Sequence, residues 1–133
     1  MIVVDASLIV ELLIRGPLTL TIEQSLADAH HPLIAPHLLD VEVVSSLRNL
    51  TASSQVDDYR SQLYLNRLAT LPVERRSHTP LLPRMWELRH NFTAYDAAYI
   101  ALAEATDSIL FTCDRKLRRG HRAEVVVFSH VVH

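Results

Sequence analysis

The chain has 133 residues, of which 49% are hydrophobic and 21% are charged, and this composition is typical of one globular domain over residues 1–133. Its apolar runs are far shorter than the roughly 18 residues of a membrane-spanning helix, and its N-terminus does not resemble a signal peptide. The formal net charge of -2 does not by itself indicate a nucleic-acid-binding protein. One cysteine excludes an internal disulfide, and two glycines exclude a glycine-rich phosphate-binding loop. We therefore expect a cytoplasmic protein with no membrane segment.

The first half of the chain alternates predicted strands and helices. Ile2, Val3 and Val4 form a β-branched run without polar alternation, which is typical of a parallel strand buried on both faces. Asp5 ends this run. In chain order we expect a strand over 2–4, a helix over 8–13 capped by Ser7, a helix over 18–29 with Leu20, Ile22 and Leu26 near one side, a strand over 32–36, a helix over 37–50, and a helix over 55–70 capped by Ser53 or Ser54, with Val56, Tyr59, Leu63 and Leu68 facing inward.

The second half continues the alternation, which predicts an α/β fold of three layers, α/β/α, with a central parallel sheet. In such sheets ligands bind beyond the carboxyl ends of the strands. The adjacent helices over 37–50 and 55–70 indicate an αα-hairpin. The remaining expected elements are a weak strand over 71–74, placed at an edge or at a strand start by Pro72, a helix over 79–88, a loop over 91–94, an alanine-rich helix over 95–105, a strand over 109–112, a short helix over 114–119 ended by Gly120, and a strand over 124–128.

Four acidic residues that are far apart in the sequence fall near the same predicted edge of the sheet. Asp5 follows the first strand, and Asp114 follows the strand over 109–112. Asp96 lies in the first turn of a helix entered from a loop, and Glu42 lies in a helix that starts from the same edge. At about 5 Å and an effective dielectric constant near 20, each pair of ionised carboxylates repels by ~3 kcal/mol. Such a cluster would have to bind protons or a cation.

Each acid also has a purely structural interpretation. Asp5 is of a residue type that is common in turns, and Asp114 is placed to cap the helix that follows it. Asp96 stands three residues after Thr93, which is close to the spacing of a capping box. Glu42 is compatible with a solvated helix position. Only the conjunction of all four acids favours a functional site.

The chemistry of four carboxylates points to a hard metal ion. Oxygen ligands without cysteine or paired histidine suit Mg²⁺ or Mn²⁺, and such sites typically act on phosphate esters. Ser7 and Thr112 flank Asp5 and Asp114, and they are placed to orient the ligands or a water molecule. A basic run beside Asp114 would be a solvated face elsewhere, but next to a phosphodiester site it is a candidate contact for the backbone of a nucleic acid. It comprises Arg115, Lys116, Arg118 and Arg119.

The stretches that contain these acids resemble, in order, the successive motifs of the PIN-domain ribonucleases. The size and layout of the chain resemble in particular the VapC-like toxins of bacterial toxin–antitoxin pairs. The resemblance extends over nearly the whole chain. The matching stretches are Val4-Asp5-Ala6-Ser7, Glu42 in an early helix, Asp96-Ala97-Ala98-Tyr99-Ile100-Ala101, and Phe111-Thr112-Cys113-Asp114-Arg115.

The resemblance implies a parallel sheet of four or five strands flanked by helices. It also implies a metal-dependent endoribonuclease that cleaves RNA and is inhibited by a cognate VapB-like antitoxin. Many relatives carry a further acid three residues after the last motif aspartate, where this chain has Leu117, and this departure leaves the number of metal ions open. By the resemblance, Asp5, Glu42, Asp96 and Asp114 would bind Mg²⁺ or Mn²⁺, with Ser7 and Thr112 supporting them.

Other functions remain open from the residues alone. One alternative keeps the metal site but acts on DNA or on a small phosphate ester, and another is an inactive α/β module that binds proteins. Tyr59 and Trp86 are expected in the core or in a subunit interface, and the apolar helix over 55–70 fits a homodimer under any of these functions. Cys113 carries no nucleophile motif and is expected to be a small buried residue.

Overall fold

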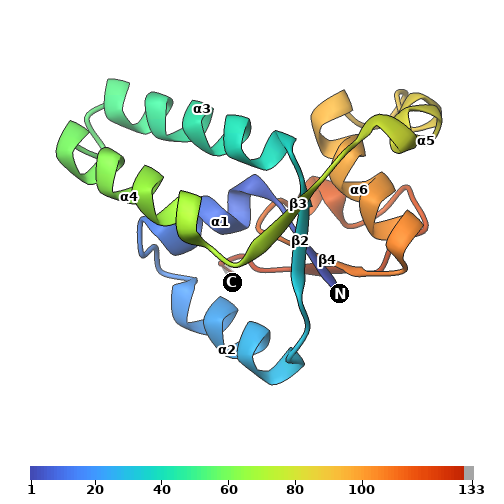
Figure 1. Cartoon of the computed structure of the whole chain (residues 1–133), viewed down its shortest axis with the longest axis horizontal. Helices are drawn as coiled ribbons and strands as arrows, with labels where there is room; N and C mark the ends of the chain where they lie inside the picture. The colour runs from blue at the N-terminus through green and yellow to red at the C-terminus, as the bar shows by residue number, and fades with distance from the viewer. Residues whose placement is uncertain (131–133) are drawn as a thin grey trace.

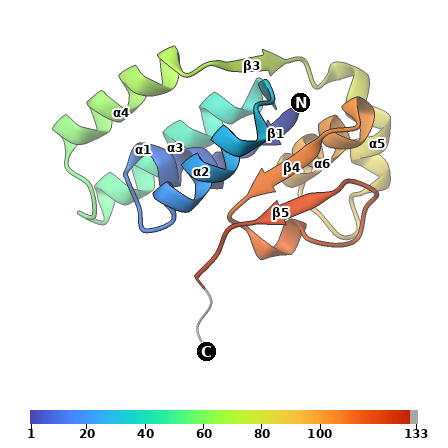
Figure 2. The ribbon, with the colours of Figure 1, turned by 90° about the horizontal axis from the view of Figure 1, so that it is seen from below.

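Five parallel strands form one sheet in the computed structural model, which describes residues 1–130. The strands lie in the order β3-β2-β1-β4-β5 across the sheet, so β1 is central and β3 is at an edge, as predicted (Figure 2). The α/β fold with a central parallel sheet is therefore confirmed. The strands are β1 (Ile2–Val4), β2 (Leu33–Pro36), β3 (Val73–Arg76), β4 (Ile109–Thr112) and β5 (Val125–Val127).

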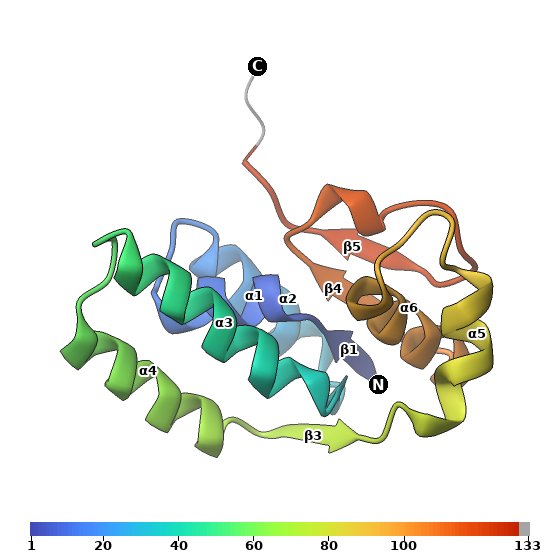
Figure 3. The same cartoon turned by 90° about the horizontal axis from the view of Figure 1, so that it is seen from above.

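Helices flank the sheet on both sides. In Figure 1 helices α1 to α4 gather on the left of the strands and α5 and α6 lie on the right, and Figure 3 shows the same division from above. No helix within residues 1–130 is long and apolar enough to cross a lipid bilayer. The helices are α1 (Ala6–Leu13), α2 (Thr19–Ala29), α3 (Leu38–Ala52), α4 (Asp58–Thr70), α5 (Leu82–Glu87) and α6 (Ala94–Thr106), with short 3₁₀ turns η1 (Thr79–Leu81) and η2 (Arg115–Leu117).

The core forms around β1 and α6. All three residues of β1 are at most 1% exposed, which explains why this strand has no polar alternation. Helix α6 packs across β1, β2 and β4, and residues 97–103 within it are all buried. Four of these seven residues are alanines, so the helix can lie close to the sheet. This packing brings the first turn of α6, with Asp96, towards the carboxyl ends of β1 and β4.

Helices α3 and α4 form the predicted αα-hairpin, and they run side by side in Figures 1 and 3. Near the turn that joins them, the hydroxyl oxygens of Thr51 and Ser61 lie 2.8 Å apart and form a hydrogen bond. The bond adds a polar contact between the two helices.

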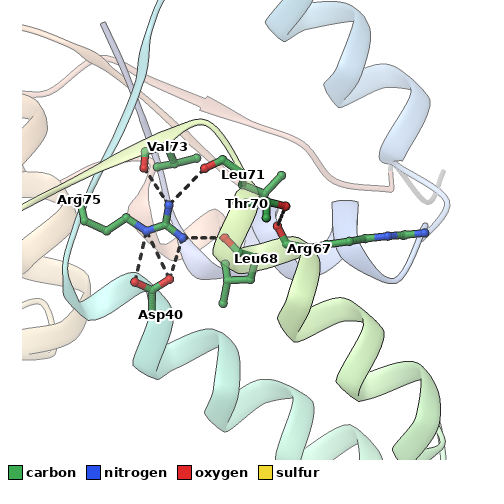
Figure 4. A network of polar contacts seen from close by, with 7 residues as sticks. All are labelled: Asp40, Arg67, Leu68, Thr70, Leu71, Val73 and Arg75. Carbon is green, nitrogen blue, oxygen red and sulfur yellow. Dashed lines mark hydrogen bonds and ion pairs between the residues drawn. The ribbon is translucent and has the colours of Figure 1, made fainter.

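At the other end of this hairpin, Arg75 of β3 forms hydrogen bonds with both α3 and the end of α4 (Figure 4). Its guanidinium donates to Asp40 of α3, with Nη2 to Oδ1 at 2.8 Å. It also donates to the backbone carbonyl oxygens of Leu68, Leu71 and Val73, and the first two belong to the end of α4. Because α3 also carries Glu42, this network helps to fix the helix that supplies one of the four acids.

Two predicted helix caps are wrong, and one predicted helix is shorter than expected. Asp5, rather than Ser7, caps α1, and Asp57, rather than Ser53 or Ser54, caps α4. Aspartate and serine are both favoured at this position, so their order in the sequence does not decide which one caps the helix. The helix expected over 114–119 is only the single turn η2, capped by Asp114.

Several apolar side chains are exposed: Tyr59 and Leu63 were predicted to face inward, Leu20 was predicted near one side of its helix with Ile22 and Leu26, and Trp86 was predicted in the core or in a subunit interface. In α4 the buried residues are Ser61 and Leu68, and Tyr64 and Leu65 on the same side of the helix pack against the core. This face has helical spacing, but Ser61 is its first residue, whereas the predicted inward set used the apolar residues Tyr59 and Leu63. The exposed side chains are Leu20 (75%), Tyr59 (73%), Leu63 (41%) and Trp86 (67%).

Candidate active site

Asp5 is a buried carboxylate at the carboxyl end of the central strand. Only 5% of the residue is exposed, and three groups donate hydrogen bonds to it. The Ser7 hydroxyl and the Leu8 backbone N–H donate to Oδ1 at 2.7 and 3.0 Å, and the Thr112 hydroxyl donates to Oδ2. Burial raises the pKa of Asp5 to about 6, even though these hydrogen bonds lower it. Asp5 thus caps helix α1, and its charged form is destabilised by burial.

Ser7 and Thr112 join the ends of β1 and β4 around this carboxylate. The Thr112 hydroxyl oxygen accepts a hydrogen bond from the backbone N–H of Asp114 at 2.9 Å. The Ser7 hydroxyl oxygen accepts one from the backbone N–H of Cys113 at 3.0 Å. These bonds hold the segment with Asp114 next to Asp5. The arrangement follows from the parallel register, which pairs Val4 with Phe111.

Asp96 and Asp114 are the next two members of the acid rim, the set formed by Asp5, Glu42, Asp96 and Asp114. Asp96 is half-buried at the start of α6, where the Thr93 hydroxyl caps the helix by accepting from the Asp96 backbone N–H at 3.1 Å. Burial and the Asp114 carboxylate raise the pKa of Asp96, and Lys116 opposes this effect. Asp114 itself caps η2 by accepting from the backbone N–H of Lys116 at 2.9 Å. The capping predicted for Asp114 and Thr93 is therefore confirmed.

Glu42 reaches the rim from α3. Burial raises its pKa, the Tyr99 hydroxyl lowers it, and the Asp96 carboxylate raises it further. Its Oε1 atom and the Tyr99 hydroxyl are both buried, and within residues 1–130 neither forms a hydrogen bond of normal geometry. A buried carboxylate oxygen without a partner is unfavourable, so this position calls for a ligand or a donor.

The four acids form a chain of electrostatic neighbours. Asp114 raises the pKa of both Asp5 and Asp96, and Asp96 raises that of Glu42. Within the described part of the chain, however, no three acid, histidine or cysteine side chains are grouped closely enough to hold one ion. The donors are all carboxylate oxygens, and Glu42 Oε1 lacks a partner, so the residues fit a hard cation. Metal binding then requires side-chain adjustment that brings the acids together.

The basic run continues from Asp114 along one exposed segment. Arg115, Lys116, Arg118 and Arg119 are all exposed, and none of them forms an ion pair within residues 1–130. Arg115 donates to the Ser129 hydroxyl and to the backbone carbonyl of His130. Lys116 lies close enough to Asp96 to stabilise its charged form. Positive charge is therefore available directly beside the acids.

Leu117 interrupts the basic run, and it is fully buried. It stands where many relatives of the resembled family have a further acid. A carboxylate at this buried position would be strongly destabilising without a partner. Leu117 therefore belongs to the core and adds no ligand to the acids around Asp114.

Sequence reasoning assigned no role to Tyr99. Its position three residues after Asp96 on a helix was the available signal, because residues with this spacing lie on the same face. Cys113 is half-buried rather than buried. Burial and the nearby Asp5 carboxylate raise the pKa of its thiol to about 12, so the thiol stays protonated and is a poor nucleophile.

Comparison with known proteins identifies the family. Residues 2–122 match the family model described as PIN domain. The chain is 35% identical over 127 residues to Ribonuclease VapC12 of Mycobacterium tuberculosis, which covers 94% of this chain and 97% of that relative. It is 44% identical over 84 residues to Ribonuclease VapC1 of the same species, over 62% of this chain and 63% of that relative.

Solved structures share the fold. The structure of VapBC2 from Rickettsia felis, bound to a DNA fragment from their promoter, matches with a TM-score of 0.71 and 14% identity, over 96% of this chain and 99% of that chain. Mycobacterium tuberculosis VapC20, a toxin that cleaves the sarcin-ricin loop, matches with a TM-score of 0.65 and 16% identity, over 88% of this chain and 92% of that chain. With the family model and the VapC relatives, these findings show that the chain belongs to the PIN-domain family and, within it, to the VapC ribonucleases.

Proposed function

We propose that this chain is the toxin of a toxin–antitoxin pair and hydrolyses RNA phosphodiester bonds at Asp5, Glu42, Asp96 and Asp114 with the help of Mg²⁺ or Mn²⁺. The observation that carries the proposal is the electrostatic coupling between these acids, which come from four separate segments. The pKa values of Asp5, Glu42 and Asp96 are all raised, partly by a neighbouring acid of the set. Acids that repel one another in a partly buried rim are typical of a cation site.

The donor set favours Mg²⁺ or Mn²⁺ over softer ions, because it consists of carboxylates alone. When bound, a divalent cation would lower the pKa of a coordinated water and neutralise charge on the phosphate. The chain's own contribution is orientation. The Ser7 hydroxyl, the Leu8 backbone N–H and the Thr112 hydroxyl all donate to the Asp5 carboxylate, so the carboxylate cannot rotate without breaking these hydrogen bonds.

The exposed basic run would bind the RNA backbone. Arg115, Lys116, Arg118 and Arg119 follow Asp114 directly, and phosphate contacts from such side chains position a strand without reading its sequence. Although the whole chain has a net charge of -2, these four basic residues concentrate positive charge beside Asp114, where an RNA strand must approach.

Two protein partners complete the proposal. A VapB-like antitoxin is supported by the solved VapBC2 complex, which shares this fold. A homodimer is supported by Tyr59 and Leu63, which are four residues apart on α4 and are 73% and 41% exposed. We place the action of the pair in the cytoplasm, where RNA substrates are available.

The test is cleavage by the purified protein of matched RNA and DNA oligonucleotides and of nitrophenyl phosphate. We expect cleavage of RNA that requires Mg²⁺ or Mn²⁺, stops with EDTA, and is lost in Asp5→Asn. Unchanged cleavage in Asp5→Asn would remove Asp5 from the site. Cleavage of DNA or nitrophenyl phosphate in place of RNA would move the protein to another class of phosphoesterase.

A further inference from the structure

The Tyr99 hydroxyl is buried near Glu42 and forms no hydrogen bond of normal geometry within residues 1–130. Tyr99 is only 1% exposed and is among the largest fully buried side chains. Its hydroxyl and Glu42 Oε1 are the two buried side-chain polar atoms without a hydrogen bond in residues 1–130. A phenylalanine would fill almost the same volume without burying an unpaired hydroxyl. Packing alone therefore does not account for a tyrosine at this position.

The neighbours of the hydroxyl belong to three other segments. Glu42 of α3, Asp5 at the end of β1 and the backbone of Ala6 are all close enough to influence it. A tyrosine hydroxyl carries a proton that it can donate, whereas a carboxylate oxygen can only accept, so of these two unpaired groups the hydroxyl is the donor. It is the donor placed to reach the buried oxygen of Glu42.

We propose that Tyr99 is a positioning residue of the acid rim, whose hydroxyl donates to Oε1 of Glu42 when a divalent cation is bound and leaves the other carboxylate oxygen for the ion. This inference rests on the proposed function of the rim. Glu42 needs such a partner because Oε1 is buried and unpaired, while the residue as a whole is still partly exposed.

The Tyr99 side chain is held more rigidly than that of Glu42, so Tyr99 orients Glu42 and not the reverse. The tyrosine ring is packed in the core among the buried residues of α6, whereas Glu42 has three rotatable bonds and a partly exposed end. The four acids do not yet surround a common point in the structure. A fixed hydroxyl at Oε1 restricts the orientations of Glu42 and so reduces the number of adjustments that metal binding requires.

The test is Mn²⁺ binding to the full chain, measured by titration calorimetry, with Tyr99→Phe as the variant. We expect its affinity for Mn²⁺ to fall roughly 10-fold, the usual scale for losing a hydrogen-bond partner of a metal ligand. The melting temperature without metal should stay the same or rise, because the variant removes an unpaired buried hydroxyl. Tyr64→Phe, which removes a hydroxyl from a partly buried tyrosine of α4, should leave Mn²⁺ affinity unchanged.

A double-mutant cycle with Glu42→Gln separates positioning from packing. If Tyr99 acts through Glu42, adding Tyr99→Phe to Glu42→Gln should change Mn²⁺ affinity by less than 2-fold. A Tyr99→Phe protein with wild-type affinity would overturn the inference, and so would an equal loss in both backgrounds. If Glu42→Gln alone kept full affinity, the metal site of the proposed function would fail first, and that result is distinct from a failure of Tyr99 alone.

Discussion

Replacing Asp5 with asparagine is expected to stabilise the protein in the absence of metal while removing its activity. The pKa of Asp5 is raised from 3.8 to about 6 by burial, so the folded state favours the protonated carboxyl. Stability contributed by this group is therefore complete below about pH 3.8, falls as the pH rises towards 6, and is fully lost above pH 6. Asparagine stays neutral and avoids this loss.

The magnitude follows from the size of the shift. About 2 pKa units at about 1.4 kcal/mol each give up to about 3 kcal/mol at pH 7.5, and Asp5 is too buried for solvent to screen the effect strongly. For a chain of this length, 1 kcal/mol corresponds to about 4 °C in melting temperature. We therefore expect Asp5→Asn to melt up to roughly 10 °C higher at pH 7.5, and about half as much higher at pH 5.

The assay is thermal unfolding with EDTA, followed by circular dichroism at both pH values. Asp28→Asn is the matched control, because Asp28 is an exposed residue of α2 with no ion pair among residues 1–130, and it should change the melting temperature little. An Asp5→Asn protein that is no more stable than the wild type at pH 7.5 would refute the reasoning, because it would show that the buried charged carboxylate of Asp5 does not destabilise the folded state.

Three further predictions concern the surroundings of the rim. Arg75→Ala should lower the free energy of unfolding by about 2–4 kcal/mol in urea titrations, because it leaves Asp40 and several buried carbonyl groups without their donor; a loss below about 0.5 kcal/mol would show that water replaces it. Leu117→Asp should unfold the protein or lower its stability by more than about 3 kcal/mol, since Leu117 is fully buried; a stable variant that binds a second Mn²⁺ would contradict this. Lys116→Gln should weaken RNA binding by the inactive Asp5→Asn protein and reduce its salt dependence by about one phosphate contact; an unchanged salt slope would remove Lys116 from the interface.

The order of elements was predictable from the sequence because the patterns are local. Buried parallel strands are short apolar runs, and the run over Ile2–Val4 was long enough to identify the central strand. The position of Asp5 beside the segment of Asp114 then followed from the rule for parallel sheets. Both inferences need only the chain direction and the identity of neighbouring strands.

What the sequence did not predict depends on contacts between elements. The inward face of α4 begins with Ser61, a polar residue that hydrogen-bonds to Thr51 of α3, and apolar patterning does not assign such a residue to the core. The cap of α1 is Asp5 instead of Ser7, because the same carboxylate is held at the end of β1 by Thr112, more than a hundred residues away. Local preferences cannot distinguish such alternatives, since each residue type is compatible with both positions.

The acid rim also shows why function, rather than stability, explains these residues. A protein selected for stability alone would replace a buried Asp5 and an unpaired Glu42, because the charged form of each is disfavoured by burial. The same burial strengthens the attraction of each carboxylate for a cation, since the surrounding dielectric is low. Binding to the folded state alone would then convert the repulsion between the acids into stability. The raised pKa values and the proposed metal affinity are therefore two consequences of one arrangement of acids. The two buried side-chain polar atoms without a hydrogen bond in residues 1–130, Glu42 Oε1 and the Tyr99 hydroxyl, both belong to it.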